Sequence, residues 1–308
     1  MKHPKRILMN LLITDIEQLR ETVKMNAVVP FESVRPFILD ATDIYIEPNI
    51  GTATLEKAEV DDTLKEKICR ALGPLAVSLA TDELGIQYGD AGITVQNKQG
   101  ERSPASDAKI AAAKANLYYR GMQALDRLLA YLAAHADEYP EYGEHQEQVT
   151  PGGCLIRSAR QYQDEGLVGI DYSTLSYRAM LPVLLQLQVR NVAEMLGEKL
   201  YTRVISGEPD DLRLLCVRYM AAKCAELHTS QTGREQRLNG NQPEFTPIIR
   251  PIYEDQTQTG NYYASQAAYY AGKIEAWKGE HPDETGEASD SGVLHWNEKD
   301  KKIFTSIS

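Results

Sequence analysis

The pattern of one helix occurs twice in this chain. PFILDATDIYIEPNIG runs from Pro36 to Gly51, and PVLLQLQVRNVAEMLG runs from Pro182 to Gly197. Both prolines and both glycines are separated by 146 residues, so the two stretches align without a gap. Apolar residues recur at the spacing of one helix face, and Pro36 is expected in the first turn, where it removes no hydrogen bond. We interpret the pair as an internal duplication.

A second pair of helices follows in the same order. Each is preceded by an Asp-Asp pair, and an extended segment and a final helix then close each half of the chain. Two amphipathic helices can share apolar spacing by chance, whereas recurrence of the whole series favours duplication. The apolar stripes, which correspond at a separation of 148 residues, are Leu64, Ile68, Leu72, Ala76, Leu79 and Leu212, Cys216, Met220, Cys224, Leu227.

These elements predict a mainly α fold made of two related helical units with β-hairpin arms. Residues 1–150 form the first unit, with a hairpin arm at 86–95, where Ile and Tyr alternate around Gly-Asp-Ala-Gly. Residues 151–278 form the second unit, with an extended arm at 243–256. The boundary is expected near Val149 to Cys154, because TPGG interrupts the periodic patterns there.

Local signals refine the expected helices. Thr14 and Glu17 have the spacing of a capping box, which begins a short polar helix. Gly73-Pro74 falls inside the helix expected at 61–84 and predicts a kink, since proline cannot donate to the preceding turn. A long helix is expected at about 106–134, followed by the polar loop DEYPEYGEHQEQVTPGG.

The C-terminal segment, residues 279–308, differs in kind. GEHPDETGEASDSG is acidic and nearly free of apolar residues, as in a flexible spacer. It leads into VLHWNEKDKKIFTSI, which predicts a C-terminal β-hairpin. Because an isolated hairpin is marginal in water, this hairpin is expected to dock on its own chain or on a neighbour.

Composition limits the classes of partner. The 308 residues include 33 Lys and Arg against 44 Asp and Glu, a net charge of -11, which argues against a surface that grips nucleic acid. The apolar run Ile7–Ile13 is too short for a secretory signal, and no window is apolar enough for a membrane span. We therefore expect a protein made in the cytoplasm, with no membrane partner.

No enzyme signature is recognisable in the sequence. It contains no GxSxG, GxxxxGK[ST] or HExxH motif, and no GxGxxG motif follows a strand. The cysteines at 69, 154, 216 and 224 form no CxxC pair and are expected to be reduced, mostly buried thiols. We predict a non-enzyme without cofactor or metal. A metal or acid–base site in His135–His145, where carboxylates and imidazoles alternate, is the alternative to a solvated loop.

Tyrosine is unusually frequent, with 17 residues against four Phe and two Trp. Tyr118-Tyr119, Tyr262-Tyr263 and Tyr269-Tyr270 are adjacent pairs on expected helices, so one ring of each pair should turn outward. Outward rings indicate either a protein interface or half-buried edges between helices. The interface residues predicted from the arms, the last helix and the tail are Tyr88, Ile93, Val95, Ile248, Ile249, Tyr253, Tyr262, Tyr263, Trp296, Ile303 and Phe304.

Four segments form a recognisable combination: NLLITDIEQLRETVKMNA, FESVRPFILDATDIYIEPNIG, GIQYGDAGI and the terminal KKIF. Through them the chain resembles an uncharacterised family encoded in phages and prophages of gut Bacteroidales, and the resemblance covers most of the chain. Residues 10–130 also resemble the head-to-tail adaptor proteins of long-tailed phages, although the helical unit is doubled here.

The resemblance implies a virion structural protein, a head-to-tail connector or adaptor in the neck beneath the portal. Its partners would be copies of itself in a ring, together with portal and tail proteins, and DNA would pass nearby without specific binding. The alternative is a cytoplasmic helical scaffold that binds a protein partner through the same arms.

Overall fold

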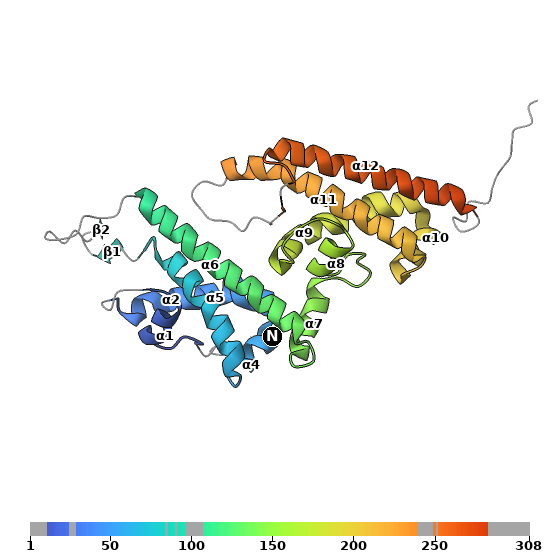
Figure 1. Ribbon diagram of the computed structural model, residues 1–308. Coiled ribbons are helices and arrows are strands. Elements are labelled where there is room, and N and C mark those ends of the chain that lie inside the picture. Colours follow the sequence, from blue (N-terminus) through green and yellow to red (C-terminus); the bar gives the residue numbers. More distant parts are fainter. Residues whose placement is uncertain are drawn as a thin grey trace, which may run out of the picture. The chain divides into compact units, whose positions relative to one another are not determined.

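The computed structural model is mainly α-helical, as the sequence predicts (Figure 1). It describes residues 11–24, 29–83, 86–89, 92–95, 107–238, 249–250 and 252–282. These residues form two compact units. The first contains the described residues up to Gly152, Ile170–Ala179 and the described residues of Thr232–Ile248, and the second contains Gly153–Gly169, Met180–Gln231 and the described residues from Ile249 onward.

Helix α5 is the centre of the first unit, because α1, α2 and α6 all pack against it. Its apolar stripe, which includes Leu64, Ile68 and Leu72, is completely buried. The elements of this unit are α1 (Ile16–Thr22), α2 (Phe31–Ala41), the π-helical turn η1 (Thr42–Ile46), α3 (Glu47–Ile50), α4 (Thr52–Lys57), α5 (Asp62–Ala80), β1 (Ile86–Gly89), β2 (Gly92–Val95), α6 (Asp107–Ala134) and α7 (Pro140–Val149). Strands β1 and β2 pair antiparallel, with Tyr88 opposite Ile93.

Gly73 allows α1 to approach α5 closely. A Cβ atom at this position would lie 1.9 Å from Oγ1 of Thr22, which is far inside van der Waals contact. Helix α5 continues through Gly73 and Pro74 to Ala80. The Gly-Pro pair therefore lies within the helix, and its glycine has a clear packing function.

The second unit contains α8 (Ala159–Asp164), η2 (Gln188–Val192), α10 (Ala193–Ser206), α11 (Asp210–Leu238) as far as Gln231, and α12 (Gln256–Glu280), and α9 (Thr174–Leu187) leads into it. Figure 1 shows α11 and α12 side by side, and Nε1 of Trp277 donates to Asp211 at 2.7 Å between them. Tyr162 of α8 is fully buried, and its hydroxyl donates to the carbonyl of Ala221 on α11 at 3.1 Å.

Both units contain a π-helical turn at the same place. The turns η1 and η2 begin at Thr42 and Gln188, which are separated by 146 residues. Each is followed by a glycine in a backbone conformation that is open almost only to glycine: Gly51 has φ 82° and ψ 153°, and Gly197 has φ 72° and ψ 161°. The two glycines are those of the repeated sequence pattern.

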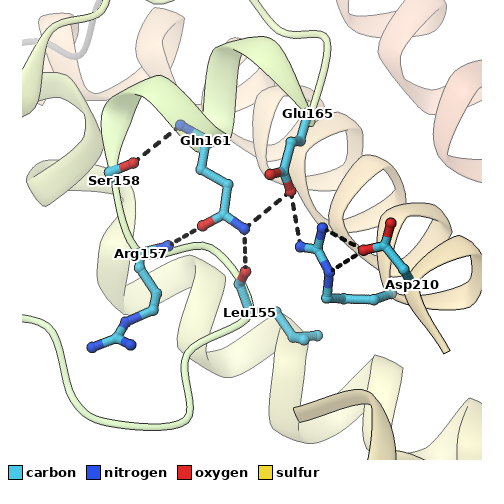
Figure 2. A network of polar contacts seen from close by, with 7 residues as sticks. Leu155, Arg157, Ser158, Gln161, Glu165 and Asp210 are labelled. Atoms are coloured by element: carbon cyan, nitrogen blue, oxygen red, sulfur yellow. Dashed lines mark hydrogen bonds and ion pairs between the residues drawn. The ribbon is translucent and has the colours of Figure 1, made fainter. Parts of the chain in front are cut away.

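The first short helix of each unit also begins in the same way. In α1, Asp15 accepts from the N–H of Gln18 at 2.9 Å, and the Gln18 side chain accepts from the N–H of Thr14 at 2.9 Å. In α8, Ser158 and Gln161 make the same two bonds, with the N–H of Arg157 as donor at 2.8 Å (Figure 2). The capping residues predicted for α1, Thr14 and Glu17, were therefore wrong by one position.

Helices α6 and α12, one in each unit, end alike. Tyr131 of α6 lies against His135, which follows that helix, and Trp277 of α12 lies against His281, which follows α12, with ring centroids 4.2 Å apart in both pairs. In each pair Nδ1 of the histidine is 2.9 Å from the carbonyl oxygen of the aromatic residue. The corresponding residues are again separated by 146 positions.

Several sequence-based expectations require correction. Helix α2 begins at Phe31, so Pro36 does not lie in the first turn. The loop expected after α6 contains α7, because Pro140 occupies the first turn, where a missing N–H costs no hydrogen bond. Helix α12 reaches Glu280, past the expected start of the spacer at 279. The C-terminal hairpin and residues 243–248 of the extended arm lie outside the described residues.

Candidate interaction surfaces

The predicted interface residues fall into different environments. Tyr88, Ile93 and Val95 lie on β1 and β2. Tyr253 is 46% exposed, whereas Tyr263 is buried and its hydroxyl donates to the carbonyl of Arg250 at 3.4 Å, which indicates a packing function. Ile249 and Tyr262 are half-buried. Ile248, Trp296, Ile303 and Phe304 lie outside the described residues.

The tyrosine pairs mark one surface clearly. Tyr118 is buried in α6, while the adjacent Tyr119 is 52% exposed. The ring of Tyr118 contacts both Tyr45 of η1, with centroids 6.0 Å apart, and Tyr119, with centroids 5.8 Å apart. The three rings form a continuous aromatic row from η1 to the surface of α6. Tyr269 of α12 is exposed in the same manner, as the pair pattern predicts.

The exposed side of α2 and η1 combines apolar and acidic side chains. Leu39 is 36% exposed and Ile44 is 54% exposed, and the exposed carboxylates of Asp40 and Asp43 lie beside them in the chain. Successive turns of a helix bring such positions onto one face. We call these four residues the acidic turn face.

The corresponding side of α9 and η2 is apolar and basic. Val189 is 63% exposed, Pro182 is exposed and Leu185 is half-buried, and the exposed Arg190 follows Val189 directly. We call these four residues the basic turn face. Val189 and Arg190 occupy the positions of Asp43 and Ile44 in the first unit. Each π-helical turn therefore exposes one apolar and one charged residue, and the charge is negative in η1 and positive in η2.

Sequence reasoning missed both turn faces. The repeated sequence pattern contains Leu39 and Leu185 at corresponding positions but gives no signal that the core leaves this position at least partly exposed. A π-helical turn shifts the register of the helix face, and no residue type specifies such a turn. The alternation of an apolar and a charged residue in each turn was the available signal.

The segment His135–His145 is a packed junction in this structure. Tyr139 and Tyr142 are buried, and the Tyr139 hydroxyl donates to Asp61 at 2.8 Å. The N–H of Leu64 and the Tyr139 hydroxyl hold the pKa of Asp61 below its ordinary value. Among the described residues, no group of His, Cys, Asp and Glu has the arrangement of a metal site. The solvated loop expected here was wrong, because its tyrosines belong to the core.

His145 of α7 packs against the α3–α4 turn. Its Nε2 lies 3.1 Å from the carbonyl oxygen of Pro48, and a Cβ atom on Gly51 would lie 2.9 Å from its Cγ. Burial lowers the pKa of His145, and the nearby positive charge of Arg178 lowers it further, against the opposing contact with Pro48. The folded protein therefore favours the neutral imidazole.

The titration of His145 predicts a loss of stability in mild acid. Because its pKa is lower in the folded than in the unfolded state, its stabilising contribution is present above the unfolded value of about 6.5 and is lost as the pH falls through the folded value. We expect the free energy of unfolding to fall as the pH is lowered through and below about 6.5, and this slope to be smaller in His145→Gln. Urea unfolding across this range measures it, and identical slopes in both proteins would contradict it.

The cysteines agree with the sequence-based interpretation. Cys154, Cys216 and Cys224 are buried, Cys69 is half-buried, and all four are free. Burial raises the pKa of Cys216 and of Cys224 to about 12, so both thiols are protonated and unreactive at neutral pH.

Comparison with known proteins gives one match. A family of unknown function (DUF6712) matches residues 15–152. The matched segment is less than half of the 308-residue chain, and it ends where the N-terminal segment of the first compact unit ends. No curated protein and no solved structure matches the chain. Among the helices in the described part, none combines the length and the apolar character needed to span a bilayer.

Proposed function

We propose that this chain is a phage virion structural protein, a head-to-tail connector or adaptor that assembles in the neck beneath the portal. The observation that carries the proposal is the pair of exposed turn faces, one in each helical unit. Exposed apolar side chains within a charged surround are typical of protein interaction sites. The proposal assigns the chain a structural function rather than a reaction.

We also propose that the two helical units arose by internal duplication. Four features recur in the same order: the capped first helix, the π-helical turn, the glycine with positive φ, and the aromatic–histidine end of α6 and α12. A chance similarity of amphipathic helices would not reproduce these local geometries together. Doubling the unit gives one chain two copies of the same surface position.

The net negative charge of the chain is compatible with a protein that DNA passes without binding. With a net charge of -11, its surface as a whole repels phosphate, so DNA would pass without being bound. The expected partners are other copies of the chain, the portal protein and the tail proteins. The strands β1 and β2 supply a short sheet to which a partner strand could be added. Such a protein is made in the host cytoplasm and ends in the virion.

Light scattering of the purified chain, alone and mixed with the portal protein proposed as its partner, tests this function. We expect an oligomer of defined size, alone or on the portal. A stable monomer that is indifferent to portal would contradict the connector function. If that monomer instead binds one cytoplasmic protein with a fixed stoichiometry, the helical scaffold would replace the connector as the function.

A further inference from the structure

The two π-helical turns differ most in their charge. Residues of α2 and η1 include Glu32, Asp40 and Asp43 and a single base, Arg35. Residues of α9 and η2 include Arg178 and Arg190 and no acid. Related surfaces in one chain have therefore acquired opposite signs.

The exposed members of these sets are the ones available to a partner. Arg35 is 3.7 Å from Glu32, and Arg178 donates to the carbonyl and side-chain oxygens of Asn49 at 2.8 and 2.7 Å. By contrast, within the described part of the chain, Asp40, Asp43 and Arg190 form no ion pair. The unpaired charges thus belong to the two turn faces themselves.

We propose that the acidic turn face of one copy binds the basic turn face of the next copy. Ile44 and Leu39 would cover Val189 and Leu185, and Asp40 and Asp43 would pair with Arg190. This proposal rests on the proposed function, because it requires that the chain self-associates.

Charge complementarity selects a second copy as the partner. Two acidic turn faces would bring like charges together, as would two basic ones, and such juxtaposition opposes association. Only the pairing of unlike faces joins apolar area to apolar area while neutralising the flanking charges. Glu194 lies one turn beyond Arg190 on α10, and its negative charge would repel the acidic turn face. The favourable contact is therefore limited to the basic turn face itself and does not extend to Glu194.

When two copies associate through one contact between an acidic and a basic turn face, one acidic turn face and one basic turn face of the two copies remain free. Each added copy presents a new acidic turn face or a new basic turn face, so association continues until a ring closes or a filament forms. The proposal therefore predicts closed rings, of which the smallest is a dimer joined by two reciprocal contacts, or open filaments. It also predicts that salt weakens them, because the charged contacts lie at an exposed surface.

Charge reversal with complementation tests the pairing. Arg190→Glu and the double variant Asp40→Lys/Asp43→Lys each place like charges on both faces, and we expect self-association to weaken at least about tenfold for each. An equal mixture of the two variants contains complementary faces at every contact, so assembly should return. Sedimentation velocity of the full chain over a range of concentrations measures all three samples.

Matched controls separate the faces from overall charge. Lys199→Glu changes charge as Arg190→Glu does, and Glu56→Lys/Glu59→Lys changes it as the other variant does, at exposed positions outside both faces. Both controls should assemble like the unaltered chain. If the turn-face variants assemble normally while the unaltered chain forms oligomers, the proposed contact is wrong and the connector function stands.

Two further outcomes would overturn the proposal. If each variant fails to assemble alone and the mixture of the two also fails to assemble, the faces do not bind each other. A chain that remains monomeric at every concentration, with and without portal, would contradict both the contact and the connector function.

Discussion

Replacing Ile38 with alanine should lower the free energy of unfolding by about 2–5 kcal/mol. Ile38 is completely buried where α2 packs against α5, so truncation removes apolar contacts and leaves a cavity. The adjacent Leu39 is 36% exposed, and Leu39→Ala should change stability by no more than about 0.5 kcal/mol. Urea unfolding followed by far-ultraviolet circular dichroism measures both values.

Adjacent residues make this comparison informative. Ile38 and Leu39 lie in the same helix and lose similar side-chain volume on substitution by alanine, so the comparison reports mainly their difference in burial. Equal losses of stability would show that Leu39 is packed inside the unit and would remove it from the acidic turn face. Leu39→Ala should instead weaken self-association, which the same samples can report by sedimentation.

Much of the helical architecture could be predicted from periodicity alone. The stripe of Leu64, Ile68 and Leu72 predicts the buried face of α5, since residues three to four apart share one side of a helix. The Asp-Asp pair before α5 was readable as a helix start because an aspartate side chain can accept from the first turn, whereas the cap of α1 is Asp15 and not the predicted Thr14. These features depend on local geometry, which a short segment of sequence determines.

The remaining features depend on contacts between distant segments. Tyr139 and Tyr142 stand among acids, prolines and glycine, and this composition suggests a loop, yet tertiary packing buries both rings. Gly73 resembles a helix breaker until the approach of Thr22 is known. The turn faces were hidden for the same reason, since exposure of Ile44 and Val189 follows from which side of each helix the core covers.

Replacing Gly51 or Gly197 with alanine should lower the free energy of unfolding of the chain by about 1–3 kcal/mol each from backbone strain. Both glycines have positive φ with extended ψ, a conformation that a Cβ atom disfavours. Gly272→Ala is the control, because Gly272 lies in the exposed middle of α12, and alanine there should stabilise the helix by about 0.5–1 kcal/mol. Thermal and urea unfolding measure the three variants.

The two positions should differ in one respect. A Cβ atom on Gly51 would lie 2.9 Å from Cγ of His145, whereas nothing lies within 4 Å of one on Gly197. Gly51→Ala should therefore cost more than Gly197→Ala, and His145→Ala should remove that excess when combined with it, which a double-mutant cycle detects as a coupling. If Gly197→Ala is neutral, the second turn does not require glycine, and the strongest local argument for duplicated units is lost. If both substitutions are destabilising and only Gly51 couples to His145, the backbone conformation of the turn requires the glycine in both units, and contact with a neighbouring side chain does not.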